Sequence, residues 1–279
     1  MIGERLQHFI ATQQRWCRAF DRALPASFLM EGASHFRQEI LSAYVLPGMA
    51  VFDVGGGKHP FFNPGEKALL HLEVFAIDIS ERELATAPPD AYDHSICADI
   101  CSYSGSGNAD LVICQAVLEH VRDINAAIQS LVSLLKPGGV ALLWVPCRNA
   151  LFARLNMLLP EHWKRRILFT IFPKTQQEHG FPAFYDRCTP EDFLHMARAN
   201  GVTAPMVQSY YMNSYFSFFL PVHMLWRTWQ LVARCVVGNQ ACESFSVALR
   251  KPLVVDNETT RFAAESPASF PRQLRDQPF

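Results

Sequence analysis

An apolar strand that runs directly into three glycines is the feature that most limits how this chain can fold. Residues 50–54 (AVFDV) are followed by Gly55, Gly56 and Gly57. Glycine has no Cβ, so the backbone can turn tightly there and approach a ligand closely. A helix N-terminus that follows such a loop favours polar ligand groups. The sequence therefore predicts a ligand site at the three glycines, with Asp53 near the end of the strand.

Further apolar runs at regular spacing predict a sheet of parallel strands. They are continuous rather than alternating, which is typical of strands that are covered on both faces. Apolar side chains at helical spacing fill residues 123–136, and Pro137-Gly138-Gly139 is expected to end that helix. Strands that alternate with helices indicate a doubly wound α/β fold with right-handed crossovers. The runs cover residues 74–78, 95–98, 109–114 and 139–145, and later ones lie at about 202–212 and 242–250.

Pattern and composition divide the chain into four segments. Apolar residues at steps of three and four, from Ile2 to Leu24 and from Phe36 to Tyr44, predict N-terminal helices. Thr189-Pro190 fits the start of a later helix. The polar C-terminal tail lacks periodicity and is expected to be disordered. The segments are the N-terminal helices (1–46), the ligand-binding core (47–150), a substrate or cap region with the last helix and strands (151–251), and the tail (252–279).

Composition narrows the class of partner. The formal net charge is −1, so the chain has no overall excess of cations for long nucleic acid. Only 18% of residues are charged whereas 49% are hydrophobic, which predicts an apolar pocket or surface beyond the ordinary core. The eight cysteines form no C-x-x-C pair, and the N-terminus has no apolar signal-peptide run. We therefore expect a cytoplasmic protein with free thiols.

The glycine loop leaves two kinds of nucleoside ligand open. Asp78 ends the next strand, near the offset at which a carboxylate accepts hydrogen bonds from a ribose. A dinucleotide site takes G-x-G-x-x-G, and here Gly55-x-Gly57 is followed by His59 and Pro60, without the third glycine. The alternative is an adenosine ligand without phosphates, such as S-adenosylmethionine.

Five stretches, in order and spacing, resemble the class I (Rossmann-like) S-adenosylmethionine-dependent methyltransferases of the small-molecule group. They are DVGGG (53–57), AIDIS (76–80), CADI (97–100), ADLVICQAVLEHV (109–121) and LLKPGG (134–139). The resemblance implies a mostly parallel, seven-stranded sheet with N-terminal helices and an apolar helical insertion or cap. It implies cofactor contacts from Asp53, Gly55, Gly56 and Gly57 along the methionine and ribose, Asp78 with Ile79 at the ribose, Asp99 and Ile100 at the adenine, and Cys114 and Gln115 near the sulfonium.

His120 follows the fourth strand and is the candidate catalytic base. A hydroxyl acceptor must lose a proton during methyl transfer, and histidine is the usual agent. The alternative is a histidine that merely packs or caps at a helix start. Some quinone O-methyltransferases that this chain resembles hold a divalent cation with Glu-x-x-Glu-His. Here Gln115 stands at the first place and only Glu119 and His120 remain, so we expect no metal site.

Substrate contacts are expected from the irregular region that follows the fifth strand. The stretch HGFPAFYDRCTP, residues 179–190, combines aromatic side chains, a phenol, a carboxylate and a guanidinium. Loops after strand ends collect substrate contacts in this architecture. The alternative is an aromatic lid that only shields the cofactor from water. The candidate substrate residues are His179, Tyr185, Arg187 and Arg148.

Residues 202–226 carry no formal charge, although Asn213, Pro221 and His223 interrupt the apolar run. As a helix after Pro221, this region has one apolar stripe and one polar stripe. The apolar stripe is Val222, Leu225, Trp229, Val232 and Val236, and the polar one is His223, Arg227, Gln230 and Arg234. An interfacial membrane helix has this pattern, and so does an insertion helix packed over a substrate pocket. A basic stretch at 163–167 offers a second anionic contact.

Together these features predict a methyltransferase that uses S-adenosyl-L-methionine. The expected acceptor is a small molecule or a saccharide- or lipid-linked group, and O-methylation is favoured over N- or C-methylation. The alternatives are a methyltransferase-fold binding protein that has lost catalysis, and an NAD-dependent oxidoreductase. If residues 215–237 contact a membrane, the protein is expected at the inner face of that membrane.

Overall fold

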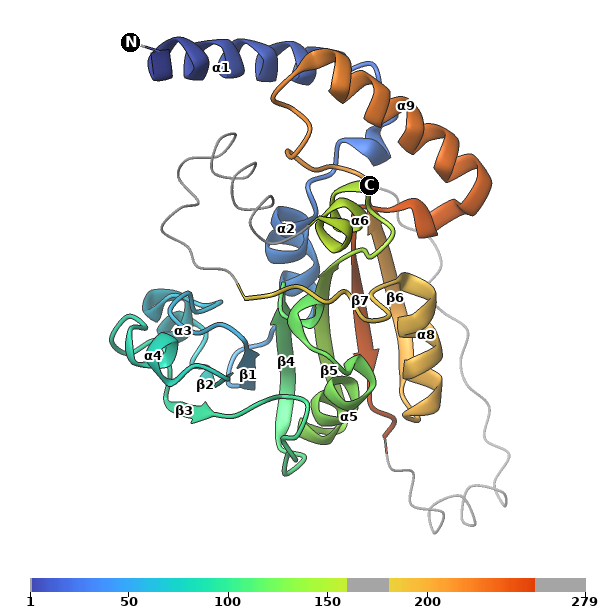
Figure 1. Ribbon diagram of the computed structural model, residues 1–279. Coiled ribbons are helices and arrows are strands. Elements are labelled where there is room, and N and C mark those ends of the chain that lie inside the picture. Colours follow the sequence, from blue (N-terminus) through green and yellow to red (C-terminus); the bar gives the residue numbers. More distant parts are fainter. Residues whose placement is uncertain (1, 160–180, 254–279) are drawn as a thin grey trace, which may run out of the picture.

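The structure is a computed structural model that describes residues 2–159 and 181–253, apart from the side chains of the first residues. His179 and the basic stretch 163–167 lie outside the described residues, as does the tail from residue 254 onward. The described chain forms a seven-stranded sheet in the order β3-β2-β1-β4-β5-β7-β6 (Figure 1). All neighbouring strands are parallel except at β7, which runs antiparallel to β5 and to β6. The predicted doubly wound, mostly parallel sheet is confirmed.

Every strand lies where an apolar run predicts one. The strands are β1 (Ala50–Val54), β2 (Glu73–Asp78), β3 (His94–Cys97), β4 (Ala109–Gln115), β5 (Leu135–Pro146), β6 (Thr203–Tyr210) and β7 (Ser244–Arg250). One boundary differs from the expectation. Pro137-Gly138-Gly139 does not form a free turn after the helix, because β5 already begins at Leu135 and pairs with β4 across a register shift at Ala109.

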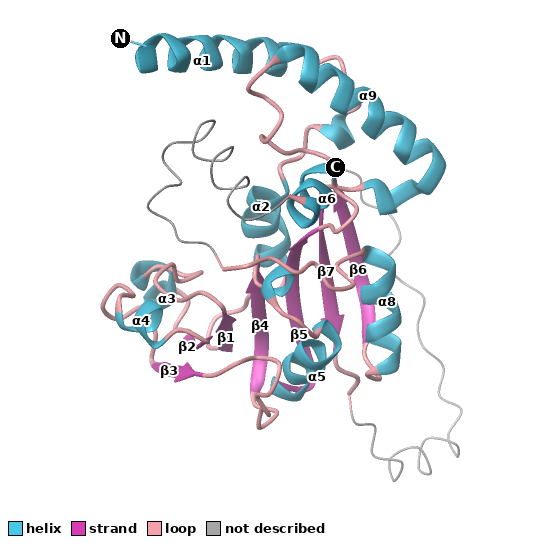
Figure 2. Ribbon diagram, in the orientation of Figure 1, coloured by secondary structure: helices cyan, strands magenta, loops and turns pink. Residues whose placement is uncertain are grey.

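Helices lie on both faces of the sheet, and two more lie beyond one of its ends (Figure 2). They are α1 (Ile2–Asp21), α2 (Gly32–His35), α3 (Pro64–Leu69), α4 (Glu81–Ala85), α5 (Ile124–Leu134), α6 (Leu151–Leu158), α8 (Pro190–Ala199) and α9 (Leu220–Val237). Short 3-10 turns lie at 26–28, 41–43, 118–120 and 238–241. The helix predicted from Phe36 to Tyr44 is broken: α2 passes into a π turn at Phe36–Ile40 and a 3-10 turn at Leu41–Ala43. The irregular region after β5 begins with α6, which periodicity did not predict.

Two apolar clusters enclose the sheet. The larger lies between one face and helices α5 and α8, with Ile128, Leu131 and Phe193 at its centre. The smaller packs Phe36, Ile40 and Leu41 of the N-terminal segment against the other face. Because both faces are covered, consecutive strand residues are buried alike, as in β7, where all but the last residue are buried. This explains the continuous rather than alternating apolar runs.

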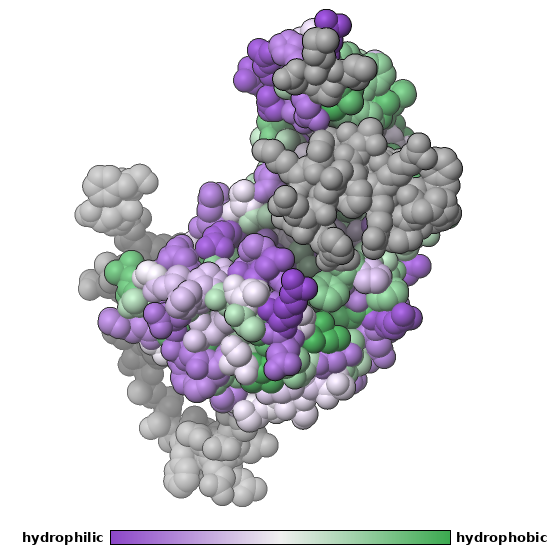
Figure 3. Space-filling view, turned by 60° about the vertical axis from the view of Figure 1, so that its left-hand side comes forward, coloured by the Kyte–Doolittle hydropathy of each residue, from purple (hydrophilic) through white to green (hydrophobic). Residues whose placement is uncertain are grey.

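Helices α1 and α9 form a separate layer beyond the end of the sheet where β4 and β5 terminate (Figures 1 and 3). We call this pair the α1–α9 layer. A buried ion pair holds it together: Arg227 Nε of α9 donates to Asp21 Oδ1 of α1 at 2.8 Å, and His223 Nε2 lies 2.8 Å from the same oxygen. Burial by itself raises the pKa of Asp21, but the hydrogen bonds from His223 and Arg227 hold it below its usual value.

A second set of buried contacts fastens the α1–α9 layer to the sheet. Arg227 Nη1 donates to the Tyr211 carbonyl at 2.7 Å, directly after β6. Glu243, directly before β7, accepts from Trp226 Nε1 at 3.0 Å and from Gln230 Nε2 at 2.8 Å. These hydrogen bonds take the place of the water contacts that the polar groups lose on burial, which buried charges require. The layer is therefore joined to the end of the sheet by hydrogen bonds as well as by apolar contact.

This network determines which face of α9 lies inside. The two stripes lie on opposite faces as predicted, but His223, Arg227 and Gln230 are 1%, 0% and 2% exposed. Leu225, Trp229, Val232 and Val236 are 73%, 58%, 53% and 76% exposed. The polar stripe is thus inside because Asp21 and Glu243 bind it there, and these four apolar side chains lie outside the two apolar clusters of the described residues.

Within residues 2–159 and 181–253, none of the helices combines the length and the apolar character that crossing a bilayer needs.

We predict that Arg227→Met lowers the free energy of unfolding by about 3–5 kcal/mol, since it leaves the Asp21 carboxylate buried beside a single partner. Urea denaturation followed by circular dichroism measures the change. Arg18→Ala removes an exposed guanidinium from α1 and should stay within about 0.5 kcal/mol of the native chain. Equal effects of the two substitutions would show that the buried pair is not what stabilises this layer.

Candidate functional site

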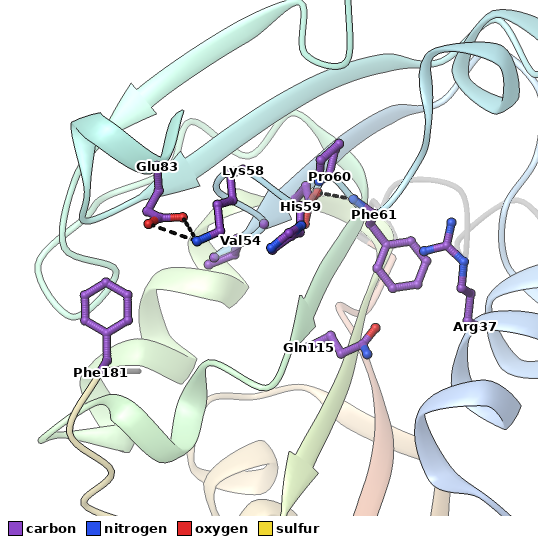
Figure 4. Close-up of a pocket in the computed structure, with 12 residues that line it drawn as sticks. Arg37, Val54, Lys58, His59, Pro60, Phe61, Glu83, Gln115 and Phe181 are labelled. Carbon is purple, nitrogen blue, oxygen red and sulfur yellow. Dashed lines mark hydrogen bonds and ion pairs between the residues drawn. The ribbon is translucent and has the colours of Figure 1, made fainter. Parts of the chain in front are cut away.

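The candidate site lies where β1 and β4 end side by side. Because these strands are parallel, Val54 of β1 is in register with Cys114 of β4, and the loops that follow both strands meet. A pocket of about 490 Å³ opens there (Figure 4). Ligands of open α/β sheets bind at this carboxyl edge. Its lining includes Asp53, Gly55, Gly56, Lys58, His59, Phe61, Glu83, Gln115, Arg37 and Phe181.

The glycines let the β1 loop pass through a space where no side chain fits. Gly55 has a φ of +78°, and a Cβ there would lie 2.1 Å from Val117 Cγ2 in the loop after β4. A Cβ on Gly56 would lie 2.4 Å from Asp53 Oδ2. Bare backbone therefore lines this part of the pocket, which is the cradle that a nucleoside cofactor requires.

Asp53 organises this loop from inside. Its Oδ2 accepts a hydrogen bond from the Phe61 backbone N–H at 2.7 Å and lies 3.4 Å from the Tyr92 hydroxyl. Burial raises the pKa of Asp53 to about 6, against the lowering effect of these hydrogen bonds. The carboxylate thus closes the loop at His59-Pro60, the segment that replaces the third glycine of a dinucleotide motif.

Asp78 ends β2, and its carboxyl group lies next to Gly57 of the glycine loop. Its Oδ2 is 3.0 Å from the position of a Cβ on Gly57, and its Oδ1 accepts from the Ser80 N–H at 2.8 Å. The side chain is 9% exposed, and burial raises its pKa. Glu83, one turn into α4, lines the pocket beside it. A predicted ribose contact by Asp78 therefore lies at the pocket's edge rather than in its wall.

The other predicted cofactor residues are spread along the same edge. Gln115 lines the pocket, and Cys114 beside it is fully buried. Ile79 is 59% exposed at the end of β2. Asp99 accepts from the Cys101 N–H at 2.9 Å, and Ile100 is buried in the larger apolar cluster. The structure thus gathers Asp53, Gly55, Gly56 and Gln115 in one pocket and leaves the adenine contacts as predictions.

Two cations in the pocket wall were missed by the sequence reasoning. Arg37 belongs to the N-terminal segment and lies 4.8 Å over the Phe61 ring, and it pairs with Glu66 at 3.2 Å. Lys58 pairs with Glu83 at 3.3 Å. Figure 4 shows both facing the same opening. Lys58 directly follows the glycines and could have been chosen on that ground, but nothing in the sequence places Arg37 there. The two cations provide partners for an anionic ligand group such as a carboxylate.

The predicted base, His120, lies just beyond this pocket in the 3-10 turn after β4. Its Nδ1 is 3.0 Å from the Pro182 carbonyl oxygen, which can only accept a hydrogen bond. Nδ1 therefore carries the proton, and Nε2 has a free lone pair when the ring is neutral. The ring also meets Phe181, a residue of the pocket wall, edge-on at 6.4 Å between centroids.

Glu119, the neighbour of His120, is a second residue that the sequence reasoning did not select. It is 5% exposed, its Oε1 lies 3.7 Å from His120 Nε2, and its Oε2 has no hydrogen-bond partner within the described residues. Burial raises the pKa of Glu119 to about 8. Its charge in turn contributes to the raised pKa values of Tyr185, Tyr215 and Cys188. A buried carboxyl that has one oxygen without a hydrogen-bond partner and lies beside a histidine is unusual outside functional sites.

The predicted substrate residues do not share one environment: Tyr185 is buried, whereas Arg187 lies in ion pairs. Tyr185 is 4% exposed with a φ of +53°, and its backbone N–H donates to the Glu119 carbonyl at 3.0 Å. Arg187 pairs with Asp123 at 3.6 Å and with Asp186 at 3.5 Å. The Arg148 backbone N–H donates to Cys188 at 2.8 Å. Tyr185 thus joins the Glu119–His120 turn, whereas the Arg187 guanidinium is engaged by carboxylates near the start of α5.

Among the described residues, no group of three or more His, Cys, Asp and Glu side chains could hold a metal ion.

Comparison with known proteins connects this geometry to a family. Residues 10–203 match the methyltransferase domain family. The ubiquinone biosynthesis O-methyltransferase of Xanthomonas campestris pv. campestris (strain B100) is 32% identical over 146 residues, which are 50% of this chain and 59% of that enzyme. The enzyme of the same name from Caulobacter vibrioides is 30% identical over 122 residues, 41% of this chain and 48% of that enzyme. The chain thus spans about half the length of the curated relatives it matches.

Among solved structures, a chain of the complex between the Haloferax volcanii Trm112 methyltransferase activator and a methyltransferase superposes with a TM-score of 0.52. Its sequence is 13% identical, and the match covers 81% of this chain and 90% of that chain. At this identity the likeness shows the fold alone. With the family match over residues 10–203, the chain belongs to the methyltransferase domain family, with the class I Rossmann-like fold and S-adenosyl-L-methionine as its methyl donor.

Proposed function

We propose that this methyltransferase O-methylates a small-molecule acceptor, or a saccharide- or lipid-linked one. The observation that carries the proposal is the Glu119–His120 turn, which places a lone pair and a buried carboxyl beside the glycine-lined pocket. The names of the relatives in ubiquinone biosynthesis support an oxygen acceptor. A methyltransferase-fold binding protein without catalysis is the alternative, and an NAD-dependent oxidoreductase is the less favoured one.

The donor fits the residues that are present. The glycine cradle accepts a close ligand, Asp78 and Glu83 flank it as hydroxyl acceptors, and Arg37 or Lys58 would bind a carboxylate. When bound, S-adenosyl-L-methionine supplies a methyl group on a positively charged sulfur, which departs as a neutral thioether. The chain's own contribution is then alignment, exclusion of water and removal of one proton.

His120 is the proposed proton acceptor. The Pro182 carbonyl fixes the Nδ1–H tautomer, so Nε2 is available to take the proton of an acceptor hydroxyl. When it is ionised, Glu119, 3.7 Å from Nε2, would stabilise the imidazolium that forms. Tyr185 would orient the acceptor from above this turn, and His179, Arg187 and Arg148 stay proposed substrate contacts. The proposal includes contact of residues 215–237 with a membrane surface, which would bring a lipid-linked acceptor to the site.

Calorimetric titration with S-adenosylhomocysteine tests the cofactor site. Asp78→Asn should weaken binding by about 1–3 kcal/mol, as loss of a charged hydrogen-bond acceptor does. Glu191→Gln removes an exposed carboxylate on α8 and should leave the affinity unchanged. An unchanged affinity of the Asp78→Asn protein would remove Asp78 from the ribose site. Binding of NADH in place of S-adenosylhomocysteine would favour the oxidoreductase.

His120→Gln should lower turnover about 100-fold or more with little change in affinity for S-adenosylhomocysteine, because a general base contributes to the chemical step. The assay follows S-adenosylhomocysteine release with an acceptor found by screening phenols, catechols, saccharides and lipid-linked forms against the native enzyme. His195→Gln, which changes an exposed histidine on α8, is the matched control. Full turnover by the His120→Gln protein would assign His120 a packing role.

The buried carboxyl of Glu119 predicts how stability depends on pH. Its pKa rises from 4.5 to about 8 on folding, so the folded protein keeps a proton that the unfolded chain releases. Stability should therefore fall as the pH rises from about 4.5 towards 8. Melting temperatures between pH 5.5 and 8 should fall less steeply for Glu119→Gln than for the native chain, and Glu81→Gln, at an exposed carboxylate, should keep the native slope. Parallel slopes for all three proteins would contradict a raised pKa at Glu119.

A further inference from the structure

The exposed side of the α1–α9 layer combines two features that ordinary protein surfaces keep apart. One is a row of large apolar side chains on α9: Leu225, Trp229, Val232 and Val236, each more than half exposed. The other is on α1 and directly after it, where Arg5, Arg15, Arg18 and Arg22 are all exposed. Figure 3 shows hydrophobic and hydrophilic surface side by side at this end of the molecule.

Acidic side chains are missing from the α9 part of this surface, while α1 carries Glu4 near its start. Residues 201–242 contain no Asp or Glu, so α9 carries none, and Glu243 after it is buried. On α1, Asp21 is buried by Arg227 and His223, and Gln13, Cys17 and Asp21 together mark the face that packs inward. With about 3.6 residues per turn, Arg15 lies roughly 160° and Arg18 roughly 100° around the helix from the centre of that inward face. Arg15 is therefore on the opposite face of α1, and Arg18 is on its exposed flank. The layer therefore presents cations with no competing carboxylate from α9.

The apolar part of the surface extends onto α1. Leu6, Phe9 and Trp16 are 44%, 47% and 53% exposed, and Phe9 meets Phe219 at the start of α9 with ring centroids 6.5 Å apart. Trp16 and Trp229 add an amphipathic ring on each helix, the residue type that prefers the boundary between lipid headgroups and acyl chains. An apolar surface rimmed by cations fits an anionic bilayer surface.

From these features we infer that α1 and α9 together form one docking surface for anionic phospholipid bilayers, in which α9 supplies the apolar contact and the arginines of α1 supply the charge. This inference rests on the proposed function and deepens it. It adds α1 to the proposed membrane contact, and it excludes Arg227 from that contact because Arg227 is buried. A second copy of the chain fits less well: a symmetric contact would bring the arginines of two α1 helices together without acidic partners from α9.

The attachment of the layer gives the docking a direction. Tyr211 and Glu243, which hold α9, lie after β6 and before β7, at the edge where β5 also ends, since Pro146 pairs with Ser244. The Gly55 loop and His120 follow β1 and β4 at this same edge. A bilayer on the α1–α9 layer would therefore face the carboxyl edge of the sheet and present membrane-resident acceptors to it.

Co-sedimentation of the full chain with vesicles tests the inference. We expect binding to phosphatidylcholine vesicles that contain phosphatidylglycerol, and weak or no binding to phosphatidylcholine alone. Leu225→Glu/Trp229→Glu and, separately, Arg15→Glu/Arg18→Glu should each weaken binding by at least about tenfold. The matched controls are Leu46→Glu/Leu69→Glu, at apolar side chains exposed by 61% and 79% away from this layer, and Arg82→Glu/Arg198→Glu, at exposed arginines on α4 and α8. Both controls should bind like the native chain.

Three results would overturn the inference. They are equal binding to both kinds of vesicle, native binding by the Arg15→Glu/Arg18→Glu protein, and a dimer in sedimentation equilibrium that Leu225→Glu/Trp229→Glu dissolves. Every variant is also titrated with S-adenosylhomocysteine. Its affinity should stay native, because the substituted side chains are exposed and lie outside the pocket lining. A variant that loses vesicle binding but keeps its affinity for S-adenosylhomocysteine has lost the docking surface alone. Failure of the native chain to bind S-adenosylhomocysteine would instead contradict the proposed function.

Discussion

The parallel direction of β1, β2, β4 and β5 is the constraint on which the rest of the structure depends. Parallel strands end at one edge of the sheet, so every loop after a strand contributes to the same region. The Gly55 loop, Gln115 and the Glu119–His120 turn become neighbours for this reason. The antiparallel β7 adds to it, because its first residues, next to Glu243, lie at the edge where its neighbours end. Site and helical layer thus share one end of the molecule.

The buried polar network around Arg227 explains why several apolar side chains of α9 are exposed. A helix with one apolar and one polar face normally buries the apolar one. In α9 the polar face finds Asp21, Glu243 and the Tyr211 carbonyl, which satisfy its hydrogen-bonding groups internally. The apolar face is left outside as a consequence. The excess of hydrophobic residues in the composition is therefore partly a property of the surface rather than of the core.

Buried carboxyls give the site its electrostatic character. Asp53 lies near the end of β1, and Glu119 lies in the turn after β4. Burial raises the pKa of Asp53 to about 6 and that of Glu119 to about 8. Asp53 uses its carboxyl to hold the Phe61 backbone and so shapes the loop. Glu119 has no such partner on Oε2 within the described residues. The contrast separates a carboxyl that organises structure from one for which we propose a part in the chemistry.

Local pattern determined the strands, the glycine loop and the place of His120, because strand periodicity and glycine chemistry act between residues close in the chain. It also separated the two faces of α9. What it could not determine is which face lies inside, since that depends on Asp21 and Glu243, which are far from Arg227 or outside its helix in sequence. The place of Arg37 in the pocket wall and the burial of Glu119 depend on tertiary contacts in the same way. Tertiary packing decides these features because the desolvation and pairing of a charge depend on neighbours that only the folded chain brings together.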